Sequence, residues 1–159
     1  MKTQSALERI WRYAPLILWI GLISFASTNE FSAINTSKIV PPLLVWLFPN
    51  ISEEKIRLVH FVVRKAAHFT EYAVLGWLAA RAFFTSSHQF LRRWWFLAGL
   101  FLIIFQALLD EYHQSFVPSR SASFVDSIID IAGGLVALIA FACLQSPAYI
   151  SRHARSVKP

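Results

Sequence analysis

Four apolar stretches set the strongest limit on how this chain can fold. They cover approximately residues 10–27, 58–84, 94–112 and 124–145 of the 159-residue sequence. About 20 apolar residues, each rising ~1.5 Å along a helix, cross a hydrocarbon core of about 30 Å. Only 15% of the residues are charged, against roughly a quarter in a soluble domain. The sequence therefore predicts an all-α fold in which residues 1–159 form one integral membrane domain, a bundle of four transmembrane helices.

A shorter apolar run, residues 43–48, follows the first stretch and lies between prolines. Because this run is too short to cross a membrane, we expect a re-entrant or interfacial segment with Trp46 at headgroup level. Ser52 and the two glutamates after it are typical of a helix start. The helix that follows is so long that it must begin outside the hydrocarbon or break near Arg64.

The first apolar stretch has two interpretations. Basic residues at positions 2, 9 and 12 precede its apolar run from Ala14 to Ala26, and small residues at positions 24 and 26 end that run, as in a cleavable secretory signal. We favour an uncleaved transmembrane helix, because the rest of the chain has the pattern of a polytopic protein.

The distribution of charge predicts the orientation. With both termini and the short 85–93 loop on one side, that side holds nine of the 15 basic residues and only one acid, Glu8. The other side holds eight of the nine acids. The positive-inside rule then places both termini in the cytoplasm of a multi-pass cell-membrane protein. Despite a net charge of +6, the basic residues form no stripe, so we expect lipids and not nucleic acid as partners.

Polar residues gather at the head of the second stretch. At 100° per residue, these polar residues fall within about 120° on one helical face. They are Arg64, Lys65, His68, Glu71 and Tyr72. A second polar group, residues 110–130, lies where the third and fourth helices would meet this face. Small residues beside Asp126 and Asp130 predict that both carboxylates face the bundle interior. On the third helix, Gln106 and Asp110 share a face with either His113 or Gln114.

Ionisable groups are costly at membrane depth, at about 2.5–3.5 kcal/mol each near the bilayer centre. We therefore expect these side chains to pair with one another or to line a polar pocket at the extracytoplasmic end. The residues expected to converge there are Arg64, Lys65, His68, Glu71, Tyr72, Asp110, Glu111, Gln114, Arg120, Ser123 and Asp126.

The two polar segments resemble the signatures of VanZ-like membrane proteins. The first is Arg64-Lys-x-x-His68-Phe-x-Glu71-Tyr72-x-x-Leu75-Gly76. The second is Asp110-Glu111-x-x-Gln114-x-Phe116-Val117-Pro118-x-Arg120-x-x-Ser123-x-x-Asp126, with Gly133-Gly134 as its tail. The resemblance covers roughly residues 14–145.

This resemblance implies a small polytopic protein of the bacterial cell envelope but no settled reaction. The family's namesake is linked to low-level resistance to teicoplanin, so the resemblance implies a connection with antibiotic resistance. Two residues depart from the family pattern: Asp130, where asparagine is commoner, and Ser119, where glycine is common. Asp130 could add a charge or a proton-binding group to the pocket.

One hypothesis for the pocket is a site that binds or remodels an anionic lipid or a lipid-linked envelope precursor. The basic residues Arg64, Lys65 and Arg120 would hold phosphate, arginine in a bidentate manner. Acidic side chains would orient these cations or bind sugar hydroxyls. The remaining substrate-binding candidates are Tyr72, Gln114, Ser123 and Asp126.

A second hypothesis is a hydrolase at the membrane surface. Glu71 with Asp110 or Glu111 would cleave a glycoside if the carboxylates lie about 5–9.5 Å apart. His68 or His113 would shuttle protons in phosphoester hydrolysis. No nucleophile motif stands out, and no cofactor is predicted.

Two further interpretations remain. In a structural or assembly protein, the polar residues would form an ion-pair knot, such as Arg64–Asp126 or Lys65–Glu71. Alternatively, His68, Glu71 and His113, with Asp110 or Glu111, would bind zinc or manganese. The spacing of these residues is much less specific than that of established metal motifs, so the predicted site includes no metal.

Overall fold

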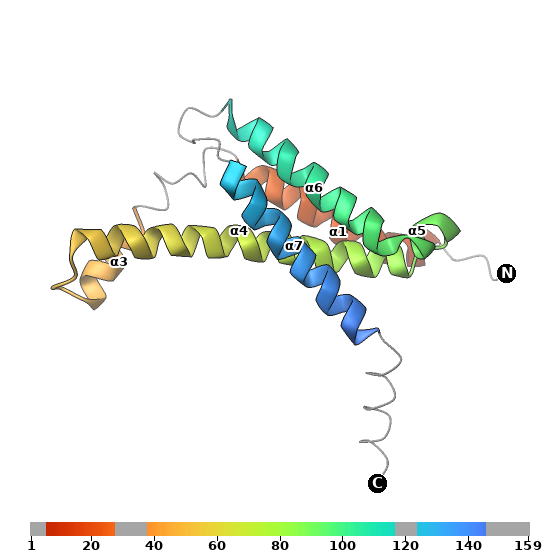
Figure 1. Cartoon of the computed structure of the whole chain (residues 1–159), viewed down its shortest axis with the longest axis horizontal. Helices are drawn as coiled ribbons and strands as arrows, with labels where there is room; N and C mark the ends of the chain where they lie inside the picture. Colours follow the sequence, from red (N-terminus) through yellow and green to blue (C-terminus); the bar gives the residue numbers. More distant parts are fainter. Residues whose placement is uncertain (1–5, 28–37, 117–123, 146–159) are drawn as a thin grey trace, which may run out of the picture.

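The computed structural model describes residues 6–27, 38–116 and 124–145. Every regular element within these ranges is an α-helix, which confirms the all-α prediction (Figure 1). The helices are α1 (Ala6–Ala26), α3 (Val40–Leu47), α4 (Glu53–Phe84), α5 (Gln89–Arg93), α6 (Trp95–Gln114) and α7 (Phe124–Leu144).

Two of these helices, α6 and α7, are long and apolar enough to cross a membrane. The first turns of α1 carry Glu8, Arg9 and Arg12, and the middle of α4 carries its polar stretch. Both features lower the mean hydropathy of their helices. Within the described ranges, only α6 and α7 are both long enough and apolar enough to cross a membrane. The bundle of four transmembrane helices therefore stays a prediction.

Helix α4 is one unbroken helix of 32 residues. At 1.5 Å per residue it is about 48 Å long, which exceeds a hydrocarbon core of about 30 Å. The alternative of a break near Arg64 is therefore wrong. The Ser52 hydroxyl accepts a hydrogen bond from the Lys55 amide at 3.4 Å, as expected of an N-cap. The first turns of α4 extend beyond the other long helices, at the left of Figure 1.

The short apolar run before α4 forms helix α3. Its prolines are the second and third residues of the helix, in the first turn, where the amide hydrogens have no intrahelical acceptor. None of its residues is buried, and Trp46 is 76% exposed. The segment expected at an interface is thus helical and apolar, and its depth in a membrane stays a prediction.

The connection between α4 and α6 contains a helix that the sequence did not predict. Residues 85–93 were expected to form a loop, whereas Gln89–Arg93 form α5. The hydroxyl of Ser86 accepts a hydrogen bond from the His88 amide at 3.1 Å, which shapes the turn before this helix. The same hydroxyl is 2.8 Å from the hydroxyl of Tyr13, so this turn is also joined to α1.

Glycines bring α4 and α7 into backbone contact. A methyl group on Gly76 would meet the carbonyl group of Gly134, and one on Gly133 would meet the carbonyl group of Phe69. Gly134 is also covered by Ile103 of α6, so three helices share one core. Gly133 and Gly134 therefore serve to pack α7 closely against α4 and α6.

Replacing Gly133 with alanine is expected to destabilise the protein by about 1–3 kcal/mol, because the added methyl group meets backbone that cannot rotate away. Gly21→Ala is the matched control, since nothing lies within 4 Å of a methyl group at that position. Unfolding of the purified protein in detergent would compare the two. Equal stability of both variants would contradict the close contact between α4 and α7.

Candidate functional site

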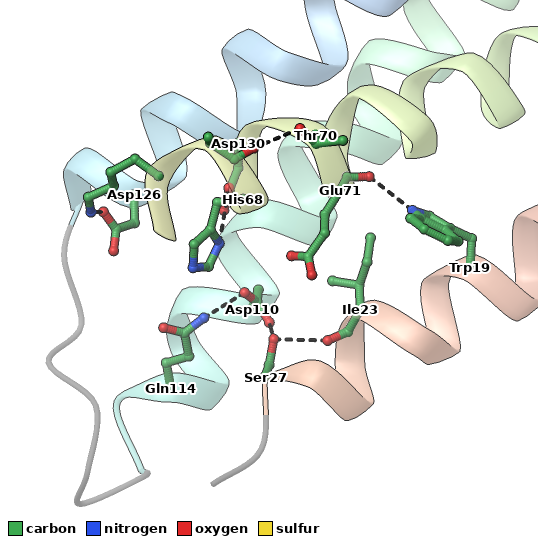
Figure 2. Close-up of polar contacts among 12 residues, drawn as sticks. Trp19, Ile23, Ser27, His68, Thr70, Glu71, Asp110, Gln114, Asp126 and Asp130 are labelled. Atoms are coloured by element: carbon green, nitrogen blue, oxygen red, sulfur yellow. Dashed lines mark hydrogen bonds and ion pairs between the residues drawn. The ribbon is translucent and has the colours of Figure 1, made fainter. Parts of the chain in front are cut away.

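Polar side chains from α1, α4, α6 and α7 meet at one end of the bundle (Figure 2). Three of their carboxylates are deeply buried: Asp110 is 4% exposed, Asp126 7% and Asp130 2%. The prediction that Asp126 and Asp130 face the interior is confirmed. We call the following set the polar cluster: Ser27, Lys65, His68, Glu71, Tyr72, Asp110, Gln114, Ser127, Asp126 and Asp130.

An ion pair between Lys65 and Asp126 joins α4 to α7. The side chains are 20% and 10% exposed, so the pair is largely shielded from solvent. The lysine ammonium also lies 5.1 Å from the ring centroid of Phe61. The pairing of Asp126 with Arg64 that the sequence suggested is therefore wrong. Neighbouring residues point about 100° apart on a helix, and only Lys65 points towards α7.

Arg64 is half-buried beside this ion pair. No hydrogen bond or ion pair joins its side chain to another residue of the described ranges. Its charge acts on the neighbouring Lys65 ammonium, which Asp126 already neutralises. As far as the described ranges go, the Arg64 guanidinium therefore keeps its hydrogen-bond donors available for an anion.

Asp110 is held by hydrogen bonds from its own helix, α6, and from Ser27, the residue directly after α1. The Gln114 amide donates to Asp110 Oδ2 at 2.7 Å, and the Ser27 hydroxyl contacts Asp110 Oδ1. The Ser27 oxygen also lies 3.0 Å from the carbonyl oxygen of Ile23, so its single proton serves either acceptor. These contacts connect the end of α1 to α6. Sequence reasoning missed Ser27, whose only signal is that it is a polar residue directly after an apolar run.

His68 and Asp130 face each other across α4 and α7, with His68 Nδ1 3.4 Å from Asp130 Oδ1. Within the described residues, neither atom has a hydrogen bond, and the buried hydroxyls of Tyr72 and Ser127 also lack one. A buried polar group without a partner costs about 1–3 kcal/mol. This part of the cluster therefore encloses polar atoms that the described residues leave without a hydrogen bond.

Glu71 is tied to α1 through its backbone. The indole nitrogen of Trp19 donates a hydrogen bond to the Glu71 carbonyl oxygen at 2.9 Å. The Glu71 side chain extends towards the space between Asp110 and Ile23 (Figure 2). Trp19 was not predicted, although an indole N–H within an apolar run needs an acceptor.

Four further residues predicted for the site are either outside the interior of the bundle or outside the described residues. Glu111 is half-buried and His113 is exposed, whereas Gln114 is the buried residue of that turn. Arg120 and Ser123 lie outside the described residues. The interior face of the third helix therefore includes Gln114 and not His113.

The metal-site alternative is not supported. Within the described ranges, no three histidine, cysteine, aspartate or glutamate side chains are placed to hold one ion. A zinc site needs at least three such ligands converging on one point. The set of His68, Glu71 and His113 with Asp110 or Glu111 is therefore not assembled.

A family model described as VanZ/LLP1 matches residues 12–145. The match covers most of the chain and both polar motifs, and it confirms the VanZ-like resemblance. No curated protein and no solved structure matches the sequence. Together with the two apolar helices, this family match is consistent with a membrane-associated protein of the cell envelope.

Replacing Lys65 with methionine is expected to destabilise the protein by about 3 kcal/mol, because the shielded Asp126 carboxylate loses its counter-charge. Adding Asp126→Leu should recover much of this loss. The control is Arg57→Gln, which breaks a pair with Glu53 whose side chains are 71% and 91% exposed. That change should cost less than about 1 kcal/mol. Denaturant unfolding would measure all three, and equal losses for the two single variants would refute a buried pair.

Replacing Ser27 with alanine should cost about 1–3 kcal/mol, because it leaves one oxygen of the buried Asp110 carboxylate without its donor. The exposed Ser87 provides the control Ser87→Ala, which should leave stability nearly unchanged. The same unfolding assay applies. A silent Ser27→Ala variant would show that the contact between α1 and α6 does not stabilise the fold.

Proposed function

Because the chain belongs to the VanZ/LLP1 family, we propose that it is a multi-pass membrane protein with a polar pocket at the extracytoplasmic face. The pocket binds or remodels an anionic lipid or a lipid-linked envelope glycan. The observation that carries this proposal is the half-buried guanidinium of Arg64, which has no partner among the described residues.

The environment of Arg64 suits a lipid phosphate. The α4 residues before it include apolar side chains that face outward, such as Leu58 and Val62. Such side chains are stable where they contact lipid tails or the headgroup boundary. Arg64 lies between this apolar surface and the polar cluster. An arginine in that position binds a phosphate through two parallel hydrogen bonds.

The rest of the cluster fits the polar part of such a ligand. Lys65 is neutralised by Asp126, so it orients the site more than it adds charge. The half-buried His68 and Glu71 are the cluster members that would contact sugar or phosphate oxygens, whereas the hydroxyls of Tyr72 and Ser127 are enclosed. By family resemblance, Arg120 and Ser123 belong to the same proposed site.

The proposed topology has four membrane-crossing helices, α1, α4, α6 and α7, and both termini in the cytoplasm. Nine of the 15 basic residues and one acid then lie on the cytoplasmic side. The polar cluster lies at the opposite end, which faces the outer leaflet. A ligand can reach that end from the outer leaflet without crossing the membrane.

Hydrolysis of a lipid-linked substrate is the alternative function. The Glu71 side chain points towards the region of Asp110 (Figure 2), as a carboxylate pair requires. However, Asp110 is already engaged by Ser27 and Gln114, which favours a structural role for it. Glu71 with Glu111 remains the better pair for this chemistry, with His68 as the proton shuttle. An ion-pair knot accounts for Lys65 and Asp126 but gives no role to Arg64.

Arg64→Gln is expected to lower retention of anionic envelope lipid by about tenfold, because a charge-assisted bidentate contact is lost. Lys55→Gln removes one positive charge from an exposed site on the same helix and is the matched control. Mass spectrometry of protein incubated with extracted envelope lipids would measure retained lipid. Equal retention by wild type and Arg64→Gln would contradict the proposal. A new product that disappears in a folded Glu71→Gln variant would establish the hydrolase instead.

A further inference from the structure

A second surface feature lies at the opposite end of the bundle from the polar cluster. An apolar groove of about 500 Å³ runs between the end of α4, α5 and the first half of α6. All eight side chains that line it are apolar, and Phe90 and Phe101 are each 72% exposed. None of the residues discussed for the polar cluster contributes to it. The groove is therefore a feature separate from the polar cluster.

The rim of the groove carries positive charge. Arg92 and Arg93 follow directly after Leu91, which lines the groove, and both arginines are exposed. The Arg93 guanidinium lies 5.9 Å from the ring centroid of Trp94, another lining residue. The sequence contains no aspartate or glutamate from residue 72 to residue 109. Within the described ranges, no ion pair engages either arginine.

Apolar lining and basic rim together match one kind of molecule. A phospholipid has an apolar chain and a phosphate at a fixed spacing, and basic pockets beside membrane helices bind anionic headgroups. Helix α6, which begins at the groove, is long and apolar enough to cross a membrane. Tryptophans at its start, Trp94 and Trp95, are the residues typical of the headgroup level. The groove thus lies where a lipid chain and its phosphate would both be in reach.

We propose that this groove is a binding site for one anionic phospholipid, whose acyl chain lies along α6 and whose phosphate contacts Arg92 and Arg93. This site is separate from the site proposed around Arg64. It does not depend on the function proposed for the Arg64 site. The leaflet alone rests on the topology proposed above: with α5 on the cytoplasmic side, the bound lipid comes from the inner leaflet, whose anionic lipids attract basic segments.

The test is native mass spectrometry of the full-length protein in detergent with an equimolar mixture of phosphatidylglycerol and phosphatidylcholine of identical chains. Every variant is also measured in an Arg64→Gln background, so that lipid bound at the polar cluster does not enter the result. We expect wild type to retain phosphatidylglycerol over phosphatidylcholine by about tenfold, and the double variant Arg92→Gln/Arg93→Gln to lose that preference. Lys55→Gln/Arg57→Gln lowers the net charge equally at exposed positions and should keep it.

A second variant tests the groove itself. Ala98 lines the groove, so Ala98→Phe would fill it and should reduce retention of both lipids about equally. Ala140→Phe, at an exposed position on α7, is the control and should retain lipid as wild type does. No preference in wild type, or equal loss in the two double variants, would overturn the proposal. A change of oligomeric state in Ala98→Phe without loss of lipid would also overturn it and identify a contact between copies.

Discussion

The close approach of α4 and α7 determines where the ionisable side chains of this protein can lie. Gly76, Gly133 and Gly134 allow backbone of one helix to touch the other. On the same helix pair, this contact brings Lys65 to Asp126 and His68 to Asp130. Charged groups are costly in an apolar bundle unless they meet a partner. The small residues of the interface thus make a polar cluster compatible with an apolar protein.

The polar cluster and the neighbouring Arg64 comprise groups that are engaged by another helix and groups that have no partner among the described residues. Asp110, Lys65 and Asp126 have partners on neighbouring helices and stabilise the bundle end. Arg64 and the hydroxyls of Tyr72 and Ser127 have no partner among the described residues. The engaged groups fix the geometry, and Arg64 faces the ligand in the proposed function. A purely structural knot would be expected to engage Arg64 as well.

The sequence predicted which faces turn inward, because helical periodicity and neighbouring small residues determine that from local information. Asp110, Asp126 and Asp130 are buried accordingly. The partner of each group depends instead on how the helices cross. Helical periodicity alone does not tell whether Arg64 or Lys65, which are about 100° apart on α4, pairs with Asp126. Ser27 and Trp19 were missed for a related reason, since their acceptors belong to helices far away in the sequence.

The central claim is that the polar cluster faces the extracytoplasmic side, and labelling of single cysteines tests it most directly. In a Cys143→Ser background, His113→Cys and His88→Cys would introduce thiols at exposed positions near opposite ends of α6. A membrane-impermeant maleimide should label the residue-113 variant in intact spheroplasts and the residue-88 variant only after permeabilisation. The reverse pattern, or labelling of both in intact spheroplasts, would contradict the account.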